Sequence, residues 1–440
     1  MKNLGEAISG STFLKAPKAA HEHSLCRVEI AENAKTLSAS ERVVEAVRNI
    51  VGEEFQPGMR ALILTGSLAR DEATWLHEKG RQRLAGDVEL IAVFSEHDRL
   101  PSAGSIAALK RAVDKWLHES GLEVHIGLSP VRPRYLRSLK PHIFAYELLE
   151  HGRVIWGDKN ILSLAPQFSP VDIPLEDGFR LLMNRIIELL EALCTSQPGM
   201  LTPRIYSELV HYRSIKLWID MATSFLLFQG QYEPTYRRRA DKLAQMASSA
   251  QAYSDGVADA PILLDRFTRQ VSLATDYKLG KTKGIGTISL KNLRSLIVDA
   301  HSIWRWELRR LTGSDDGADD NEMLKRWLKS QVISGRIRGW AATAKRYGLR
   351  RSTRMLPRWV RLGLKGSPRR LVYAVASQLF FAMNSTLPDK NDSGSGTGLK
   401  ASLAIGELPV VTNSGTENSW RGIGQAMAWN YHQFLESTRS

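Results

Sequence analysis

The sequence has few cysteines and no long apolar run, and these two absences exclude several classes of protein. Two cysteines, Cys26 and Cys194, are too few for a disulfide framework or a four-ligand zinc site. The longest apolar run, Leu371 to Met383, is shorter than the roughly 20 residues that a membrane-spanning helix needs. Residues 1–18 lack the basic region and apolar core of a secretion signal. We therefore expect a cytoplasmic protein with no transmembrane segment.

Acidic residues are nearly missing from one segment of the chain. Between Asn321 and Arg370 there are fifteen Lys and Arg residues and one acid, Glu322, so this segment alone matches the net charge of +14 of the whole chain. The rest of the protein is therefore neutral. A basic segment that also contains tryptophans fits contact with an anionic membrane surface, which would make the protein peripheral at the membrane. It also fits contact with the phosphates of RNA or DNA, and a solvated helical face is the third interpretation.

Short apolar runs in the first third of the chain predict the strands of a small sheet. Ala61 to Thr65 is too short for a helix, which indicates a buried strand. Val88 to Phe94 and Leu122 to Leu128 are predicted as two further strands, and residues 102–119 have the apolar spacing of an amphipathic helix. The charged stretch from Leu76 to Leu84 separates the first two strands, and its basic part, Lys79 to Arg83, is interpreted as an inserted surface loop.

From Leu175 the pattern is helical for about 140 residues and is interrupted by Pro and Gly signals. We predict an α+β chain in which a small mixed-sheet domain is followed by an all-α helical domain and a basic helical region. Four glycines favour several short helices in the basic region: Gly335, Gly339, Gly348 and Gly363. The predicted divisions are an N-terminal arm (1–40), the mixed-sheet domain (41–165), the helical domain (166–313), the basic helical region (314–392), and a linker with a C-terminal segment (393–440).

Two motifs in the first domain suggest phosphate and metal chemistry. Asp87 and Glu89 are two residues apart on a predicted strand, so their carboxylates point to one face and can bridge a pair of metal ions. The preceding strand ends at Gly66 and Ser67, where glycine lets the backbone turn tightly and approach a phosphate. Each motif alone is common in turns and solvated strands. Their order along the chain favours a phosphate cradle that faces a metal site.

These motifs resemble a known family. The run from Gly66 to Thr74, followed by Asp87 to Leu90, looks like the signature of the polymerase-beta-type nucleotidyltransferase superfamily, including its minimal and aminoglycoside-modifying members. The resemblance extends to Tyr146–Leu149 with Gly152–Asp158, and more weakly to Gly230–Tyr236, and it covers roughly residues 45–245. It implies Mg²⁺-dependent transfer of a nucleoside monophosphate from a nucleoside triphosphate to an acceptor that the sequence does not identify.

The resemblance also implies roles for individual residues. Gly66 and Ser67 would bind the nucleotide phosphates, and Asp87 and Glu89 would bind two Mg²⁺ ions. Arg70 is a further candidate for phosphate contact because a guanidinium offers a bidentate fork, with an ordinary surface arginine as the alternative. Lys216 and Asp220 lie four positions apart on a predicted helix. Lys216 could face the nucleotide, or it could form a local ion pair with Asp220.

One position departs from the family pattern. Catalytic members have a third carboxylate on a following strand, which helps to deprotonate the attacking hydroxyl. Here that strand offers Glu123, whereas the family pattern aligns at least as well with His125. Histidine can act as a general base but is a poorer Mg²⁺ ligand than an oxygen donor. The alternative to an enzyme is therefore a catalytically weak nucleotide-binding adaptor, which would engage a protein, a membrane surface or nucleic acid through its helical and basic regions.

Overall fold

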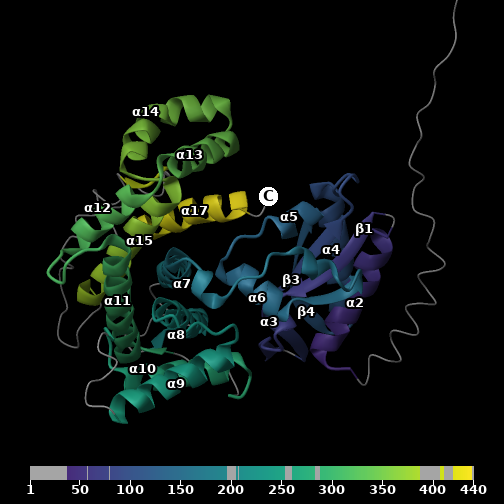
Figure 1. Ribbon diagram of the computed structural model, residues 1–440, viewed down its shortest axis with the longest axis horizontal. Coiled ribbons are helices and arrows are strands. Elements are labelled where there is room, and N and C mark those ends of the chain that lie inside the picture. Colours follow the sequence, from purple (N-terminus) through teal and green to yellow (C-terminus); the bar gives the residue numbers. More distant parts are fainter. Residues whose placement is uncertain are drawn as a thin grey trace, which may run out of the picture.

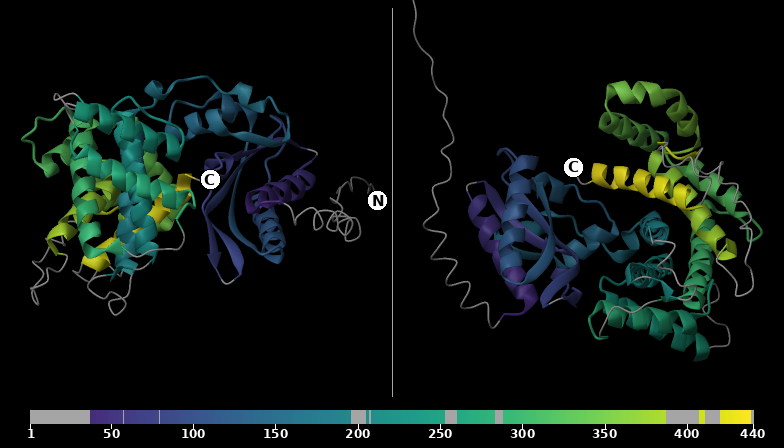
Figure 2. Two further views of the ribbon diagram at one scale, coloured as in Figure 1. Left: turned by 90° about the horizontal axis from the view of Figure 1, so that it is seen from below. Right: turned by 180° about the vertical axis from the view of Figure 1, so that it is seen from behind.

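The computed structural model describes residues 37–56, 58–78, 80–195, 205–206, 208–252, 260–282, 288–386, 407–410 and 420–438. Within these ranges a small mixed sheet is followed by a large assembly of helices, and Figures 1 and 2 show the sheet and the helices side by side. This confirms the predicted α+β class. Residues 1–36 of the predicted arm and all of the Ser393–Gly398 linker lie outside the described residues.

The sheet has five strands in the order β2-β3-β1-β5, with β4 also paired to β3. The pairs that involve β1 and β2 are antiparallel, whereas β3 and β4 are parallel. Three strands lie where apolar runs predicted them, although the strand of Asp87 begins seven residues earlier than expected. The bounds are β1 (Met59–Thr65), β2 (Trp75–Glu78), β3 (Arg81–Phe94), β4 (Leu122–Val131) and β5 (Arg153–Gly157).

The surface loop predicted over Lys79 to Arg83 is wrong at Arg81–Arg83, and the charged stretch around it, Leu76 to Leu84, is largely β-strand. This stretch belongs to β2 and the start of β3, which pair antiparallel from Trp75 opposite Leu84 to Glu78 opposite Arg81. Trp75 and Leu84, at one end of this pairing, pack in the core, and most of the other side chains are polar. Without apolar alternation, the sequence gives no period-two signal for these strands.

Successive side chains of the strands point to opposite faces of the sheet, and each face carries its own apolar core. Leu64, Val88 and Ile126 contribute to one apolar core, which α2 (Ala39–Glu54) and α4 (Ala103–Glu119) cover. Ile63, Ile91 and their neighbours contribute to the other core, which α5 (Pro133–Arg137) and α6 (Ile143–His151) cover in part. Asp87 and Glu89 have the same parity as Ile91, so they lie on the α6 side of the sheet.

The helical domain begins with α7 and is built around one large apolar core. The core continues from Phe179 on α7 through Trp304 on α11 to Trp327, Val372 and Tyr431. The later helices α12, α15 and α17 therefore share this core. The first helices are α7 (Leu175–Thr195), α8 (Glu208–Phe228), α9 (Tyr236–Ala252), α10 (Leu264–Lys278) and α11 (Leu290–Thr312). One short strand pair, β6 (Ile205–Tyr206) with β7 (Ile288–Ser289), was not predicted.

The basic region folds as several short helices, as predicted. Gly348, with φ +72°, separates two of them, whereas Gly335, Gly339 and Gly363 lie inside helices. The helices of this region are α12 (Asp320–Ser330), α13 (Ile333–Tyr347), α14 (Leu349–Lys365) and α15 (Pro368–Thr386), and α17 (Trp420–Thr438) follows in the C-terminal segment. Helices α13 and α14 form a hairpin that stands out from the body (Figure 1). Across the described residues, no helix has both the length and the apolar character needed to cross a membrane.

Candidate functional site

The turn after β1 requires glycine for two reasons. Gly66 has φ +74°, a conformation that residues with a Cβ rarely adopt. A Cβ added there would also lie 2.9 Å from Glu89 Oε2. Ser67 follows in the short helix α3 (Gly66–Ala69), and its Oγ lies 4.0 Å from the Cβ position of Gly86. The predicted phosphate turn and the predicted metal-binding strand are therefore in direct contact.

Asp87 and Glu89 both lie exposed on the same face of β3. Glu89 is in register with Thr65, the last residue before the glycine turn. Asp87 is in register with His125 on β4. The structure thus brings together four of the residues singled out from the sequence, namely Gly66, Ser67 and the two carboxylates.

His125, and not Glu123, is the β4 residue in register with Asp87. Strands β3 and β4 are irregular between Arg83 and Asp87, so that Glu123 is in register with Arg83 and His125 with Asp87. Both side chains are exposed and share the face of the carboxylates. Two residues along a strand separate Glu123 from His125 by roughly 7 Å of backbone. The register therefore favours His125 as the neighbour of Asp87.

The donor set fits Mg²⁺ that is shared with a bound triphosphate. Mg²⁺ is commonly held by one or two carboxylates together with substrate phosphates and water. Asp87 and Glu89 provide two hard oxygen donors beside a turn suited to phosphate. No group of three or more His, Cys, Asp or Glu side chains with metal-binding geometry occurs within the described residues. A protein cage that binds the metal without nucleotide is therefore not formed by these residues.

One wall of the site comes from the helical domain. Tyr212 on α8 donates a hydrogen bond of 2.7 Å to the carbonyl oxygen of Ala85, two residues before Asp87. Lys216 lies one turn further along the same helix, so both side chains are on the same side of α8. A second link between the domains is the hydrogen bond of 2.5 Å that the Thr74 hydroxyl donates to the carbonyl oxygen of Lys278. These contacts place α8 next to the start of the carboxylate strand.

Lys216 belongs to a charged cluster on α7 and α8. Its Nζ donates to Glu188 at 3.0 Å, whereas Asp220 pairs with Arg185, so Lys216 and Asp220 do not pair with each other. Burial of Lys216 and the nearby Arg185 guanidinium lower the pKa of the ammonium to about 8, against the opposing effect of Glu188. Arg213 also pairs with Glu188. The cluster contains three cations and two anions, which leaves it one positive charge when Lys216 is protonated.

Arg70 is buried, so the alternative of an ordinary surface arginine is wrong. Its guanidinium donates to Glu72 at 3.2 Å and to Glu147 on α6 at 2.6 Å. Glu147 also accepts from Tyr232 at 2.8 Å and from Arg239, both in the helical domain. The Arg70 side chain is thus part of an ionic junction between the two domains, and its predicted phosphate contact is a separate role that this geometry does not display.

Sequence reasoning did not identify this ionic junction, which we define as Arg70, Glu72, Glu147, Tyr232 and Arg239. Its partners are far apart in the chain, 77 residues between Arg70 and Glu147 and 92 between Glu147 and Arg239, so no local period reveals them. The one signal was the family resemblance of Tyr146–Leu149 and Gly230–Tyr236, because these segments contain Glu147 and Tyr232.

The chain matches no protein-family model and no curated protein sequence. Among solved structures it is similar to spectinomycin adenyltransferase AAD(9) from Enterococcus faecialis, whose crystal structure contains ATP and spectinomycin. The two chains are 12% identical, the TM-score is 0.34, and the match covers 61% of this chain and 98% of that chain. At this identity and score, the likeness is too distant to assign a function to the present protein.

Proposed function

We propose that this protein is a Mg²⁺-dependent nucleotidyltransferase that moves a nucleoside monophosphate from a nucleoside triphosphate to an acceptor and releases pyrophosphate. The observation that supports this most directly is the contact between Gly66 and the Glu89 carboxylate. It joins a turn suited to phosphate with an exposed carboxylate pair on one strand. A site with these parts can hold a triphosphate and the cation that accompanies it.

Each residue has a specific part in the proposed reaction. Gly66 and Ser67 bind the phosphates, and Asp87 with Glu89 holds Mg²⁺, which when bound neutralises charge on the triphosphate. Lys216 supplies a positive charge from the helical domain wall. Arg70 positions that wall through the ionic junction, since it is held by Glu72 and Glu147.

The acceptor oxygen bonds to the α-phosphorus while the bond from that phosphorus to pyrophosphate breaks. The acceptor proton then needs a base beside the carboxylates. The register places His125 next to Asp87 and Glu123 next to Arg83, so we assign this proton to His125 and keep Glu123 as the alternative. The acceptor is not specified by the metal site, because acceptors are chosen by the appended domain.

A second candidate function is nucleotide binding without turnover, in which the helical and basic regions act as an adaptor. One observation favours it: within the described residues, only two carboxylates meet at the site, and the β4 residue in register with Asp87 is a histidine. This function retains the phosphate turn and the bound cation but has no acceptor chemistry.

The two functions are separated by measuring nucleotide binding and pyrophosphate release on the same protein. The full chain is mixed with each nucleoside triphosphate, Mg²⁺ and panels of acceptors: aminoglycosides, sugar phosphates, proteins and RNA ends. An enzyme releases pyrophosphate, and His125→Gln lowers the rate more than Glu123→Gln does. The reverse order assigns the proton to Glu123. Binding of ATP without pyrophosphate release from any panel supports the adaptor, and absence of binding contradicts both functions.

A further inference from the structure

The hairpin of α13 and α14 exposes large aliphatic side chains away from the domain that holds the nucleotide site. On α14 these are Leu356, Val360 and Leu364, with exposed fractions of 55%, 59% and 76%. On α13 they are Ile333 and Ile337, with exposed fractions of 70% and 62%. Exposed aliphatic residues are normal when scattered singly, but five on one helical hairpin form a patch that needs a partner.

Helical spacing arranges these residues in two rows. Residues four apart lie on one side of a helix, so each helix has one aliphatic row. The two helices pack on each other where Trp340 of α13 approaches Gly363 of α14 and where Trp359 is buried, while both aliphatic rows remain exposed. We call these two exposed rows together the aliphatic face.

Positive charges border the aliphatic face. Arg338, Lys345, Arg354 and Arg361 are exposed. Within the described part of the chain, none of them pairs with a carboxylate. The sequence also contains no acid from Met323 to Arg370. A surface that combines exposed aliphatic side chains with unneutralised cations is complementary to an anionic lipid bilayer, which offers apolar depth below a negative surface.

The aromatic residues of the hairpin point inward, which favours a lipid surface over nucleic acid. The rings of Trp340 and Trp359 lie 5.9 Å apart, and Tyr347 packs edge-on against Trp359 at 5.9 Å. Single-stranded nucleic acid is typically bound by exposed aromatic rings on which bases stack. Here the rings stabilise the hairpin and the aliphatic side chains face out.

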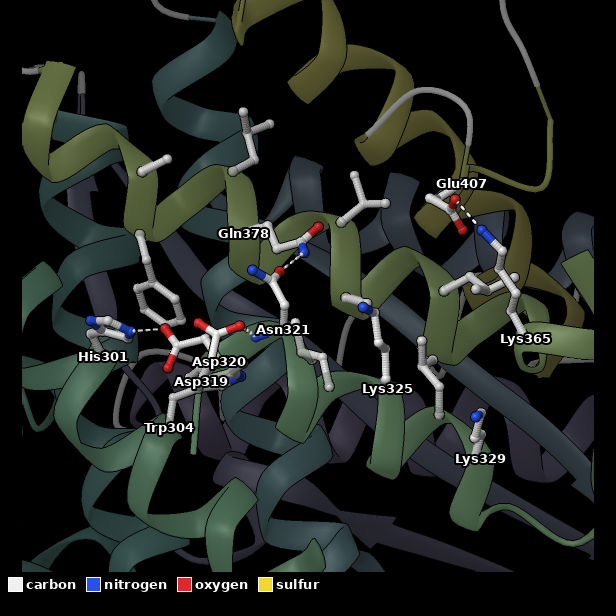
Figure 3. Close-up of a pocket in the computed structure, with 18 of the residues that line it drawn as sticks. His301, Trp304, Asp319, Asp320, Asn321, Lys325, Lys329, Lys365, Gln378 and Glu407 are labelled. Atoms are coloured by element: carbon white, nitrogen blue, oxygen red, sulfur yellow. Dashed lines mark hydrogen bonds and ion pairs between the residues drawn. The ribbon is translucent and has the colours of Figure 1, made fainter. Parts of the chain in front are cut away.

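A groove next to the hairpin also combines apolar side chains with lysines. It has a volume of about 1170 Å³, lies between α11, α12 and α15, and has an apolar floor that includes Leu324, Leu371 and Leu379. Figure 3 shows Lys325, Lys329 and Lys365 toward one end of the groove, where Lys365 pairs with Glu407, and Asp319 with Asp320 toward the other end. The end with the lysines is also lined by Leu364, a member of the aliphatic face.

We propose that the aliphatic face of the α13–α14 hairpin docks on the surface of an anionic lipid bilayer, with the aliphatic rows entering the headgroup boundary and the bordering Arg and Lys side chains contacting lipid phosphates. This interaction is independent of the nucleotidyltransferase proposal, because the residues that form it are outside the nucleotide site.

The test is partition of the full chain onto vesicles of phosphatidylcholine alone or with one quarter phosphatidylglycerol, measured by sedimentation. The protein binds the vesicles that contain phosphatidylglycerol and binds phosphatidylcholine at least about tenfold more weakly, since each cation near an anionic surface contributes roughly fivefold. Leu356→Ser with Val360→Ser lowers binding by about tenfold or more, because two aliphatic side chains no longer leave water. Arg354→Gln with Arg361→Gln also lowers binding and reduces its dependence on salt.

Matched controls separate this effect from general loss of surface apolarity. Leu273→Ser with Val171→Ser removes two aliphatic side chains that are 61% and 75% exposed elsewhere, and vesicle binding is unchanged. Circular dichroism and thermal unfolding check that each variant is folded. The wild-type protein is a test by itself, since equal binding to both vesicle compositions overturns the proposal. Binding of a single-stranded RNA oligonucleotide in place of vesicles, or vesicle binding unaffected by the aliphatic variant, also overturns it.

Discussion

Two carboxylates on the α6 side of the sheet differ in what surrounds them. Glu147, in the ionic junction, is largely buried and receives hydrogen bonds from Arg70, Tyr232 and Arg239. Asp87, in the candidate site, is exposed, and no hydrogen bond or ion pair to it is found within the described residues. A carboxylate held by three donors stabilises the fold, whereas one that faces water retains its capacity to bind a cation. The difference separates a structural cluster from a functional one.

The largest expected effect concerns turnover. Asp87→Asn removes a hard oxygen donor from an exposed position, so we expect the rate of pyrophosphate release to fall by about a thousandfold, or roughly 4 kcal/mol of transition-state stabilisation. The free energy of unfolding changes by less than about 0.5 kcal/mol, because an exposed side chain is replaced. Parallel assays of turnover and chemical denaturation measure both. A large loss of stability would show that Asp87 is structural and would remove the contrast with Glu147.

Glu147→Gln is the opposite case. It leaves the buried Arg70 and Arg239 guanidiniums without their shared counter-charge, and we expect the free energy of unfolding to fall by about 3 kcal/mol. Urea denaturation measures this loss. Glu150→Gln, on the same helix, is the control and leaves stability unchanged. If Glu147→Gln were as stable as the wild type, the ionic junction would not hold the two domains together.

Glu307 adds a third carboxyl group to the comparison, and its contribution to the free energy of unfolding depends on pH. Glu307 on α11 is fully buried, and burial raises its pKa to about 8 against the opposing effect of the neighbouring Ser224 hydroxyl. The folded state therefore holds a proton that the unfolded state releases near pH 4.5, so this group lowers stability as the pH rises from about 4.5 to about 8.

We expect the free energy of unfolding of the wild type to fall by about 2 kcal/mol between about pH 5.5 and pH 7.5 because of Glu307. The Glu307→Gln variant should not show this fall. Unfolding free energies of wild type and variant at both pH values give the difference. Glu119→Gln, which is exposed, leaves the pH dependence as it is in the wild type. An unchanged slope in Glu307→Gln would show that Glu307 is ionised in the folded protein.

The smallest expected effect concerns Lys216, which is partly buried but lies beside the site. Since its pKa is lowered to about 8, the ammonium loses its charge as the pH rises through this value. We expect ATP affinity to fall over the same range, and Lys216→Met to weaken binding about fivefold at neutral pH, or about 1 kcal/mol, and to remove the pH dependence. Calorimetric titration at several pH values measures this, with Lys115→Met as the control. Equal affinities would place Lys216 with the structural charges.

Sequence patterns predicted much of the fold because the decisive signals are local. Apolar runs placed β1 and most of β4, and 3.6-residue spacing placed α4 and α7. They failed for β2 and the start of β3, where most side chains are polar and the few apolar ones do not alternate. In the candidate site, the motif spacing identified Gly66, Ser67, Asp87 and Glu89. The choice between Glu123 and His125 depended on strand register, which the spacing of either strand alone does not specify.

The sequence by itself determined the uneven distribution of charge along this protein and the residue types of the predicted phosphate turn. Both are local properties, since the first is composition and the second is a glycine that precedes a strand with an exposed carboxylate pair. Tertiary structure decided which charges are structural. Arg70 and Glu147 are 77 residues apart, and only packing of α3 beside α6 makes them partners in a buried pair. Tertiary structure also decided which side of α14 faces water, since Trp359 is buried whereas Leu356, Val360 and Leu364 on the same helix are exposed.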